Sequence, residues 1–233
     1  MTYTAVVAIL AVPFLLAIII GSILLKRAFA LPKLLLEEIA LAIAWVFVVG
    51  SLIWLGAFLT ESTLLGFSAP WTWLTAAHFA FAGYGALTIT ALSCRVVSNQ
   101  HALRILRILL IAHPVAYLVT AAGISGYPYC DELGAISYQL IFITQLWTVI
   151  LGRPNRIARS PRLLLILALA VPIITLIPAL AWALGTPIFD LARMIQYHGI
   201  VNAIGHVGLA FAAFGWGHPP SQHINNLEVK VAP

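Results

Sequence analysis

Residues 4–25 read TAVVAILAVPFLLAIIIGSILL, a run of 22 residues without a charged side chain. A transmembrane helix needs about 20 consecutive apolar residues to cross the hydrocarbon core of a bilayer. The run is therefore long enough to span a membrane as one helix. Lys26 and Arg27 follow it and no basic residue precedes it, which is not the layout of a cleavable signal peptide.

The composition of the whole chain agrees with this first segment. Of its 233 residues, 62% are hydrophobic and only 8% are charged. Soluble domains carry about 25% charged residues. A chain this apolar cannot cover its own surface with polar groups in water, which excludes a soluble enzyme, a disordered protein and a nucleic-acid binder. The sequence predicts an all-α, polytopic membrane protein.

Seven segments are long and apolar enough to span the bilayer. We expect one seven-helix transmembrane domain over residues 1–217, followed by a polar, disordered C-terminal tail over residues 218–233. The predicted spans lie near residues 4–25, 39–59, 71–92, 104–122, 134–151, 163–184 and 191–216.

The positive charges alternate from loop to loop. Ten of the twelve Lys and Arg residues fall in three short stretches, 26–33, 95–107 and 153–162. The loops between these stretches carry acids instead: Glu61 in one, Asp131 and Glu132 in the other. Cytoplasmic loops of membrane proteins are enriched in Lys and Arg. The pattern predicts an N-terminus outside and a C-terminus in the cytoplasm.

Polar side chains gather in the predicted outer half of the bilayer. At about 1.5 Å per residue, His78, His113 and His198 each lie about 11–13 Å below the outer end of their helices. Polar residues inside a membrane are costly and usually face the bundle interior. Packing alone can explain a single histidine, but it explains three imidazoles at one depth less easily. Further polar groups are Tyr117 on the fourth predicted span and Tyr138, Gln139 and Gln145 on the fifth.

The seventh span carries the most informative motif. His198, Asn202 and His206 are spaced i, i+4 and i+8, which places them within about 80° of one another on an α-helix. We expect His198 and Asn202 to face a cavity, with His78, His113 or Gln145 on its far wall. At the rim, Arg193 is the only base among four outer acids, so we expect it to pair with Asp190, Glu61 or Asp131.

No metal or cofactor is expected. His198 and His206 lie about 12 Å apart along a helix axis, too far to share a zinc ion at about 2.0–2.1 Å from each. A zinc site built from His78, His113 and His198 stays an alternative. The sequence contains no P-loop, no Gly-rich nucleotide fingerprint, no haem motif and no lysine for a retinal Schiff base on the last helix.

The run RMIQYHGIVNAIG, residues 193–205, resembles the C-terminal helix of YndJ-like membrane proteins. Those bacterial proteins carry a similar Tyr-His-Gly-x-x-Asn-Ala-x-Gly stretch. The resemblance implies a bacterial inner-membrane location and draws attention to His198 and Asn202. It implies no substrate.

Two hypotheses follow. The first is an intramembrane enzyme that performs non-redox acid–base chemistry, such as cyclisation, isomerisation or epoxide opening, on a lipophilic isoprenoid- or polyketide-like substrate. The second is a small transporter or proton-coupled channel, and a zinc-dependent intramembrane hydrolase ranks third. The expected partners are the substrate and membrane lipids, with no nucleic acid, and the oligomeric state is left open. Candidate catalytic residues are His198, Asn202, His78, His113, Asp131 and Asp190. Candidate substrate-binding residues are Gln145, Tyr117, Tyr138, Gln139, Arg193, Glu61 and His206.

Overall fold

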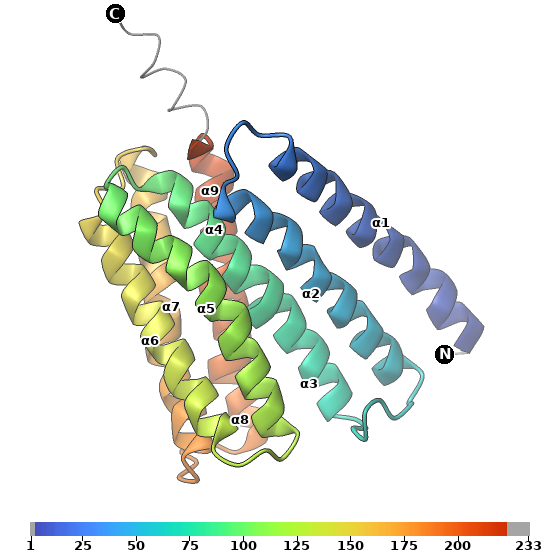
Figure 1. The fold of residues 1–233 in the computed structure, drawn as a ribbon. Coiled ribbons are helices and arrows are strands. Elements are labelled where there is room, and N and C mark those ends of the chain that lie inside the picture. The colour runs from blue at the N-terminus through green and yellow to red at the C-terminus, as the bar shows by residue number, and fades with distance from the viewer. Residues whose placement is uncertain (1–2, 223–233) are drawn as a thin grey trace, which may run out of the picture. The chain divides into compact units, whose positions relative to one another are not determined.

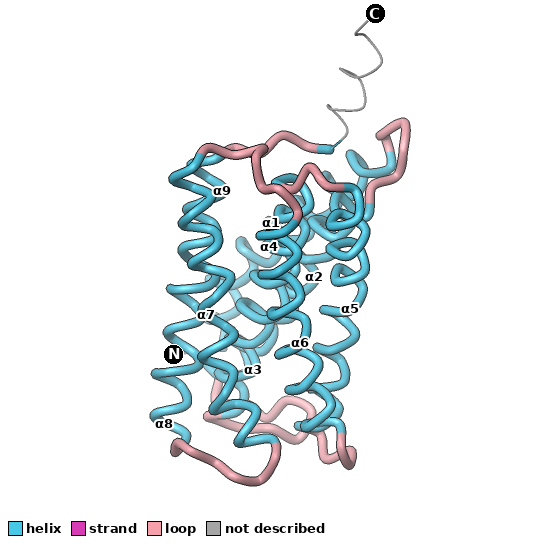
Figure 2. Tube along the Cα trace, turned by 90° about the vertical axis from the view of Figure 1, so that its left-hand side faces the viewer, coloured by secondary structure: helices cyan, strands magenta, loops and turns pink. Residues whose placement is uncertain are grey.

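The fold was analysed in a computed structural model that describes residues 3–222, and within this range it consists of helices and loops without a strand (Figures 1 and 2). Within residues 3–222, seven helices are long and apolar enough to cross a membrane, which confirms the predicted all-α, seven-span architecture. The elements are α1 (Tyr3–Phe29), α2 (Leu36–Leu59), α3 (Trp71–His78), η1 (Phe79–Gly85), α4 (Ala86–Val96), α5 (Gln100–Ile124), α6 (Cys130–Leu151), α7 (Arg159–Ala183), α8 (Leu191–Met194), η2 (Ile195–Ile200), η3 (Asn202–Gly208) and α9 (Leu209–Gly217).

The helices extend beyond the predicted spans at ends that hydropathy cannot detect. The span predicted from residue 104 begins at Gln100, because the side chain of Asn99 accepts hydrogen bonds from the backbone N–H groups of His101 and Ala102. Such an N-cap satisfies donors that the first helical turn leaves unpaired. Likewise, α6 starts at Cys130 with Asp131 and Glu132 in its first turn. Acids are favourable there because they complement the helix dipole.

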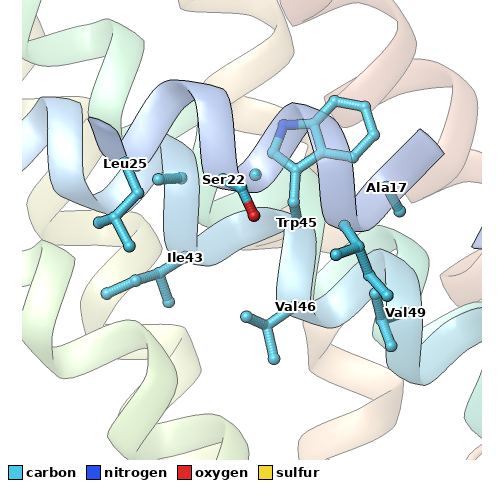
Figure 3. A pocket seen from close by; sticks show the side chains of 10 residues that line it. Ala17, Ser22, Leu25, Ile43, Trp45, Val46 and Val49 are labelled. Atoms are coloured by element: carbon cyan, nitrogen blue, oxygen red, sulfur yellow. The ribbon is translucent and has the colours of Figure 1, made fainter. Parts of the chain in front are cut away.

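The chain divides into two compact units, Met1–Thr88 and Ile89–Pro233. The boundary falls inside α4, so it is not marked by a loop. In the first unit, α1 packs on α2, and α2 packs on α3 and η1. A cleft of about 230 Å³ lies between α1 and α2 (Figure 3). Ser22 supplies its one side-chain hydroxyl, and the remaining lining is Ala17, Ile18, Gly21, Leu25, Ala42, Ile43, Trp45, Val46 and Val49.

The second unit is held by contacts between successive spans: α5 with α6, α6 with α7, and α7 with η2, η3 and α9. Glycines set the distance between α5 and α6. A Cβ atom on Gly134 would lie 2.9 Å from the Cα atom of Thr120, and one on Gly152 would lie 2.7 Å from the Cβ atom of Ala102. Both ends of the α5–α6 pair therefore depend on the absence of a side chain, which is typical of closely packed membrane helices.

The first residues of the expected polar tail are ordered against the second unit. The buried side chain of Gln222 donates hydrogen bonds to the carbonyl oxygens of Cys94, at 2.6 Å, and Val97, at 3.2 Å. Arg156 donates to the carbonyl oxygens of Pro220 and Ser221. Burial and the nearby charge of Arg95 lower the pKa of the Arg156 guanidinium. The disorder predicted from residue 218 is therefore wrong for residues 218–222, and its remainder, residues 223–233, lies outside the described residues.

Candidate functional site

His206 is fixed by a carbonyl group that a proline leaves without its helical donor. Pro172 lies inside α7 and has no N–H to donate to the carbonyl of Ala168, four residues earlier. The Nδ1 atom of His206, on η3, lies 2.9 Å from that oxygen. Because a carbonyl only accepts, Nδ1 must carry the hydrogen. The neutral imidazole then presents a bare lone pair at Nε2.

His113, on α5, is also buried and also has one ring nitrogen in contact with a protein oxygen. Its side chain is 2% exposed, and its Nε2 atom lies 2.9 Å from the hydroxyl oxygen of Thr90 on α4. A threonine hydroxyl can donate or accept, so this contact is compatible with either neutral tautomer of the ring. The contact fixes the ring orientation and leaves Nδ1 on the other side.

An aromatic ring on α6 joins the two imidazoles. Phe142 makes edge-to-face contacts with both rings, at centroid distances of 5.5 Å to His113 and 5.2 Å to His206. Edge-to-face contacts between aromatic rings are favourable and directional. Tyr138 stacks on Phe142 at 6.0 Å and lies 6.0 Å from His113. Tyr117 is buried and interacts with Tyr138.

Gln145 completes the group. It lies on α6, is fully buried, and approaches His113 closely enough for a polar interaction. We call His113, Gln145 and His206 the imidazole–amide cluster. Among the described residues, no hydrogen-bond partner is found for Nδ1 of His113, Nε2 of His206, or either polar atom of the Gln145 amide. Three helices of the second unit thus each carry a buried side chain with polar atoms that have no described hydrogen-bond partner.

His198 and Asn202 form a second polar group against α7, built around Thr175. The Thr175 hydroxyl donates to Oδ1 of Asn202 at 2.7 Å. Nδ1 of His198 lies 3.1 Å from the Thr175 carbonyl oxygen and 3.2 Å from Nδ2 of Asn202. One ring nitrogen thus faces both an acceptor and a donor. Either neutral tautomer of His198 finds a partner there without movement of the helix.

The backbone of the seventh span differs from the α-helix on which the predicted spacing rested. His198 lies in η2 and His206 in η3, and both are π-helical segments. A π-helix closes i→i+5 hydrogen bonds and is frequent at functional sites. The predicted angle and rise between His198, Asn202 and His206 therefore do not apply as calculated. His206, rather than His198, lies against Phe142 and beside His113.

Other predicted site residues lie elsewhere. His78 and Glu61 belong to the first unit, where both are exposed and Nδ1 of His78 donates to the carbonyl of Leu74 on its own helix. Gln139 donates from its amide to the carbonyl oxygen of Ile173 and so joins α6 to α7. Asp131, partly buried, belongs to the first turn of α6.

The ion pair predicted for Arg193 is not formed with either acid of its own unit. Asp190 caps α8 by accepting a hydrogen bond from the backbone N–H of Arg193 at 2.8 Å. Within residues 89–222, the Arg193 guanidinium forms no salt bridge with Asp190 or Asp131. The Asp190 carboxylate is occupied by the helix end, which competes with the side-chain pair.

Across residues 3–222 the structure brings together no group of three or more His, Cys, Asp or Glu side chains that could hold a metal ion. The nitrogen-bearing groups that do meet are two imidazoles and an amide. Their arrangement suits hydrogen bonding and proton transfer to a small polar group.

Sequence reasoning missed Thr90, Phe142, Thr175 and the carbonyl of Ala168. One signal was available for the last of these. A proline inside an apolar helix leaves a carbonyl four residues earlier without its donor, and in a membrane water does not replace that donor. A histidine on the next span is a suitable donor. The presence of Pro172 could therefore have predicted that His206 donates a hydrogen bond to the Ala168 carbonyl.

Comparison with known families places the chain beside a family model. The sequence model of the family described as YndJ-like protein matches residues 1–206, far beyond the short motif that carried the resemblance. The matched region includes the whole imidazole–amide cluster and ends at His206. Searches of curated proteins and of solved structures give no match.

Proposed function

The chain belongs to the YndJ-like family, and we propose that it is an intramembrane enzyme performing non-redox acid–base chemistry on a lipophilic, isoprenoid- or polyketide-like substrate. The observation that supports the proposal is the imidazole–amide cluster. Two buried imidazoles each have one ring nitrogen fixed by the protein and the other without a described partner. We further propose a location in the bacterial inner membrane, with the N-terminus outside.

The roles of the two histidines differ. His206 is the base in this proposal, because its Nδ1–H is directed to the Ala168 carbonyl and Nε2 carries the lone pair. His113 is the acid in its imidazolium form, in which Nε2–H donates to the Thr90 hydroxyl oxygen and the proton on Nδ1 is the one given up. In an isomerisation, His113 gives one proton to the substrate while His206 removes one from a neighbouring carbon. Transfer of the proton from His206 back to His113 restores the starting state.

The surrounding side chains suit such chemistry. Phe142 and Tyr138 supply aromatic faces, which stabilise positive charge developing on a protonated isoprenoid. Positioned acids and bases contribute about 10²–10⁴-fold to rate. Imidazole is suited to both tasks because its unperturbed pKa lies near neutrality.

The test uses conservative variants and a panel of neutral isoprenoid alcohols, epoxides and polyketide-like enones. Purified protein in lipid nanodiscs is incubated with the panel in deuterated buffer, and products are identified by mass spectrometry. We expect isomers or hydrates that contain solvent deuterium. His206→Gln keeps a donor for the Ala168 carbonyl but has no titratable nitrogen, so the rate should fall by about 10²–10⁴-fold.

The matched control is His101→Ala, an exposed histidine on α5, which should keep the wild-type rate. His113→Gln tests the second imidazole on the same helix. Equal rates for His206→Gln, His113→Gln and wild-type protein would contradict the proposed chemistry.

A second candidate function, proton-coupled transport, is favoured by one observation. Hydrogen bonds join Thr175 on α7 to His198 and Asn202, which lie on the same span as His206. Intramembrane groups of this kind also serve as proton relays. Proteoliposomes containing a pH-sensitive dye separate the two functions: transport predicts proton flux that is lost in His198→Gln, whereas the enzyme predicts product formation without flux.

A further inference from the structure

The buried atoms of the imidazole–amide cluster have an unusual hydrogen-bond deficit. His113, Gln145 and His206 are 2%, 0% and 3% exposed, yet four of their polar atoms have no partner among the described residues. Buried side-chain polar atoms in folded proteins nearly always have a partner, either protein or ordered water. An unpaired buried polar group is destabilising, because it loses its hydrogen bonds to water and gains none in return. A deficit concentrated on three neighbouring side chains indicates a site for a bound group.

The deficit also describes the hydrogen bonds that this group must make. Nε2 of His206 is an acceptor, since Nδ1 donates to Ala168. The Gln145 amide offers both a donor and an acceptor, and apart from its interaction with His113 neither atom has a hydrogen-bond partner among the described residues. A ligand group that donates one hydrogen bond and accepts another matches these atoms. A hydroxyl group does so with a single oxygen.

Charge narrows the ligand further. Glutamine is neutral, and neither imidazole carries a fixed charge of the kind that holds an anion or a cation. Moving an ionised group into an apolar interior costs far more than moving a hydroxyl. Phe142 lies against both imidazoles, so the wall beside the unpaired atoms is apolar. The ligand is therefore neutral at the group that enters the cluster.

We propose that the imidazole–amide cluster binds the hydroxyl group of a neutral lipophilic alcohol, which accepts a hydrogen bond from Gln145 and donates one to Nε2 of His206. This inference rests on the proposed function for the lipophilic part of the ligand, and it narrows the substrate class to alcohols. Bound water has the same hydrogen-bonding chemistry, so the test must separate the two sources of the hydroxyl.

The probes are farnesol and farnesyl methyl ether, which share the same chain but differ in the hydroxyl hydrogen. Thermal unfolding of the purified full-length protein is followed in detergent at saturating probe. We expect farnesol to raise Tm by about 2–4 °C, the shift that about 1 kcal/mol of ligand stabilisation gives for a protein of this size. The methyl ether cannot donate to His206 and should not shift Tm. Equal shifts for both probes, or no shift with farnesol, would overturn the proposal in favour of micelle effects or of water alone.

Two glutamines on α6 provide the matched variants. Gln145→Leu removes an amide without a described partner, whereas Gln139→Leu removes one that donates to the Ile173 carbonyl. Gln145→Leu should leave the Tm of the unliganded protein unchanged or higher and should abolish the farnesol shift. Gln139→Leu should lower the unliganded Tm but keep the farnesol shift. Retention of the shift in Gln145→Leu would overturn the proposal.

A measurement on wild-type protein covers the case in which Gln145→Leu does not fold. With ¹⁵N-labelled histidine, farnesol should shift the Nε2 resonance of His206 toward that of a hydrogen-bonded acceptor, and the methyl ether should not. An unchanged resonance would overturn the proposal. Farnesol binding without any product that depends on His206 would contradict the proposed enzymatic function but would support the alcohol-binding site. Product formed from the epoxides or enones, without binding that depends on a hydroxyl group, would support the enzymatic function and contradict the alcohol-binding site.

Discussion

His206 and Ala168 are joined by a hydrogen bond that exists because α7 contains a proline. The Ala168 carbonyl receives no helical N–H from Pro172, and the Nδ1 atom of His206 lies 2.9 Å away. The bond fixes both the ring and its tautomer. Through this bond, Pro172 on α7 determines which ring nitrogen of His206, on the next span, carries the hydrogen.

Pro172→Ala tests this relationship. The new N–H at residue 172 would compete with His206 for the Ala168 carbonyl, so the imidazole should lose its single tautomer. In ¹⁵N-histidine spectra, we expect the Nδ1 and Nε2 shifts of His206 to move toward those of a mixed population. Pro178→Ala, on the same helix, is the control, because the carbonyl four residues before it belongs to Ile174. An unchanged His206 in Pro172→Ala would show that another interaction fixes the ring.

Thr175→Val should destabilise the contact between α7 and the seventh span. It removes the hydroxyl that donates to Oδ1 of Asn202 at 2.7 Å and keeps the shape of the side chain. We expect a loss of about 1 kcal/mol in unfolding free energy, the scale measured for hydrogen bonds between membrane helices. Unfolding in mixed micelles measures it. Thr175→Ser retains the hydroxyl and should recover most of the loss; equal losses would assign the effect to packing.

Gly134→Ala should separate α5 from α6. The added Cβ would lie 2.9 Å from the Cα atom of Thr120, a backbone atom that can move only with its helix. Overpacking of this kind costs about 1–3 kcal/mol. The control is Gly199→Ala, where a Cβ meets no atom within 4 Å. It should be neutral or stabilising by up to about 1 kcal/mol, the helix-propensity difference. Similar Tm values for the two variants would refute the close-packing argument.

The orientation of the chain remains a prediction from its charges, and reporter fusions test it. Alkaline phosphatase joined after Leu65, between α2 and α3, should be active. The same enzyme joined after Asn155, between α6 and α7, should be inactive, because that loop carries the Arg cluster. The opposite pattern would reverse the membrane sides and the depths assigned to every polar residue.

The number and approximate limits of the spans could be predicted from the sequence because hydropathy acts over about 20 residues at once. The candidate site could be predicted only as a set of polar residues. His113, Gln145, Tyr138 and His206 were all candidates, yet nothing in a single helix period says which helices turn them toward one another. Phe142 was hidden because one more phenylalanine in an apolar span carries no signal.

The seventh span illustrates the other limit. His198 attracted the functional prediction through its regular spacing with Asn202 and His206, which assumed an α-helix. The π-helical segments η2 and η3 changed the register of that face. A π-segment adds a residue to one turn, and no residue type marks it in the sequence. Thr175 and Ala168 on α7 then determined which polar group each side chain reached.

The hydrogen bonds of the Gln222 amide show that the folded part of the chain extends beyond the last membrane span. Hydropathy places the end of the last span at Gly217, yet five residues later the Gln222 amide donates hydrogen bonds to the carbonyl oxygens of Cys94, in α4, and of Val97, just after it. The apolar spans end at Gly217, whereas the packed structure continues to Gln222. A chain truncated after the last apolar residue of the seventh span would lose the Gln222 amide. The Cys94 carbonyl on α4, more than a hundred residues earlier in the sequence, would then lose this hydrogen-bond donor.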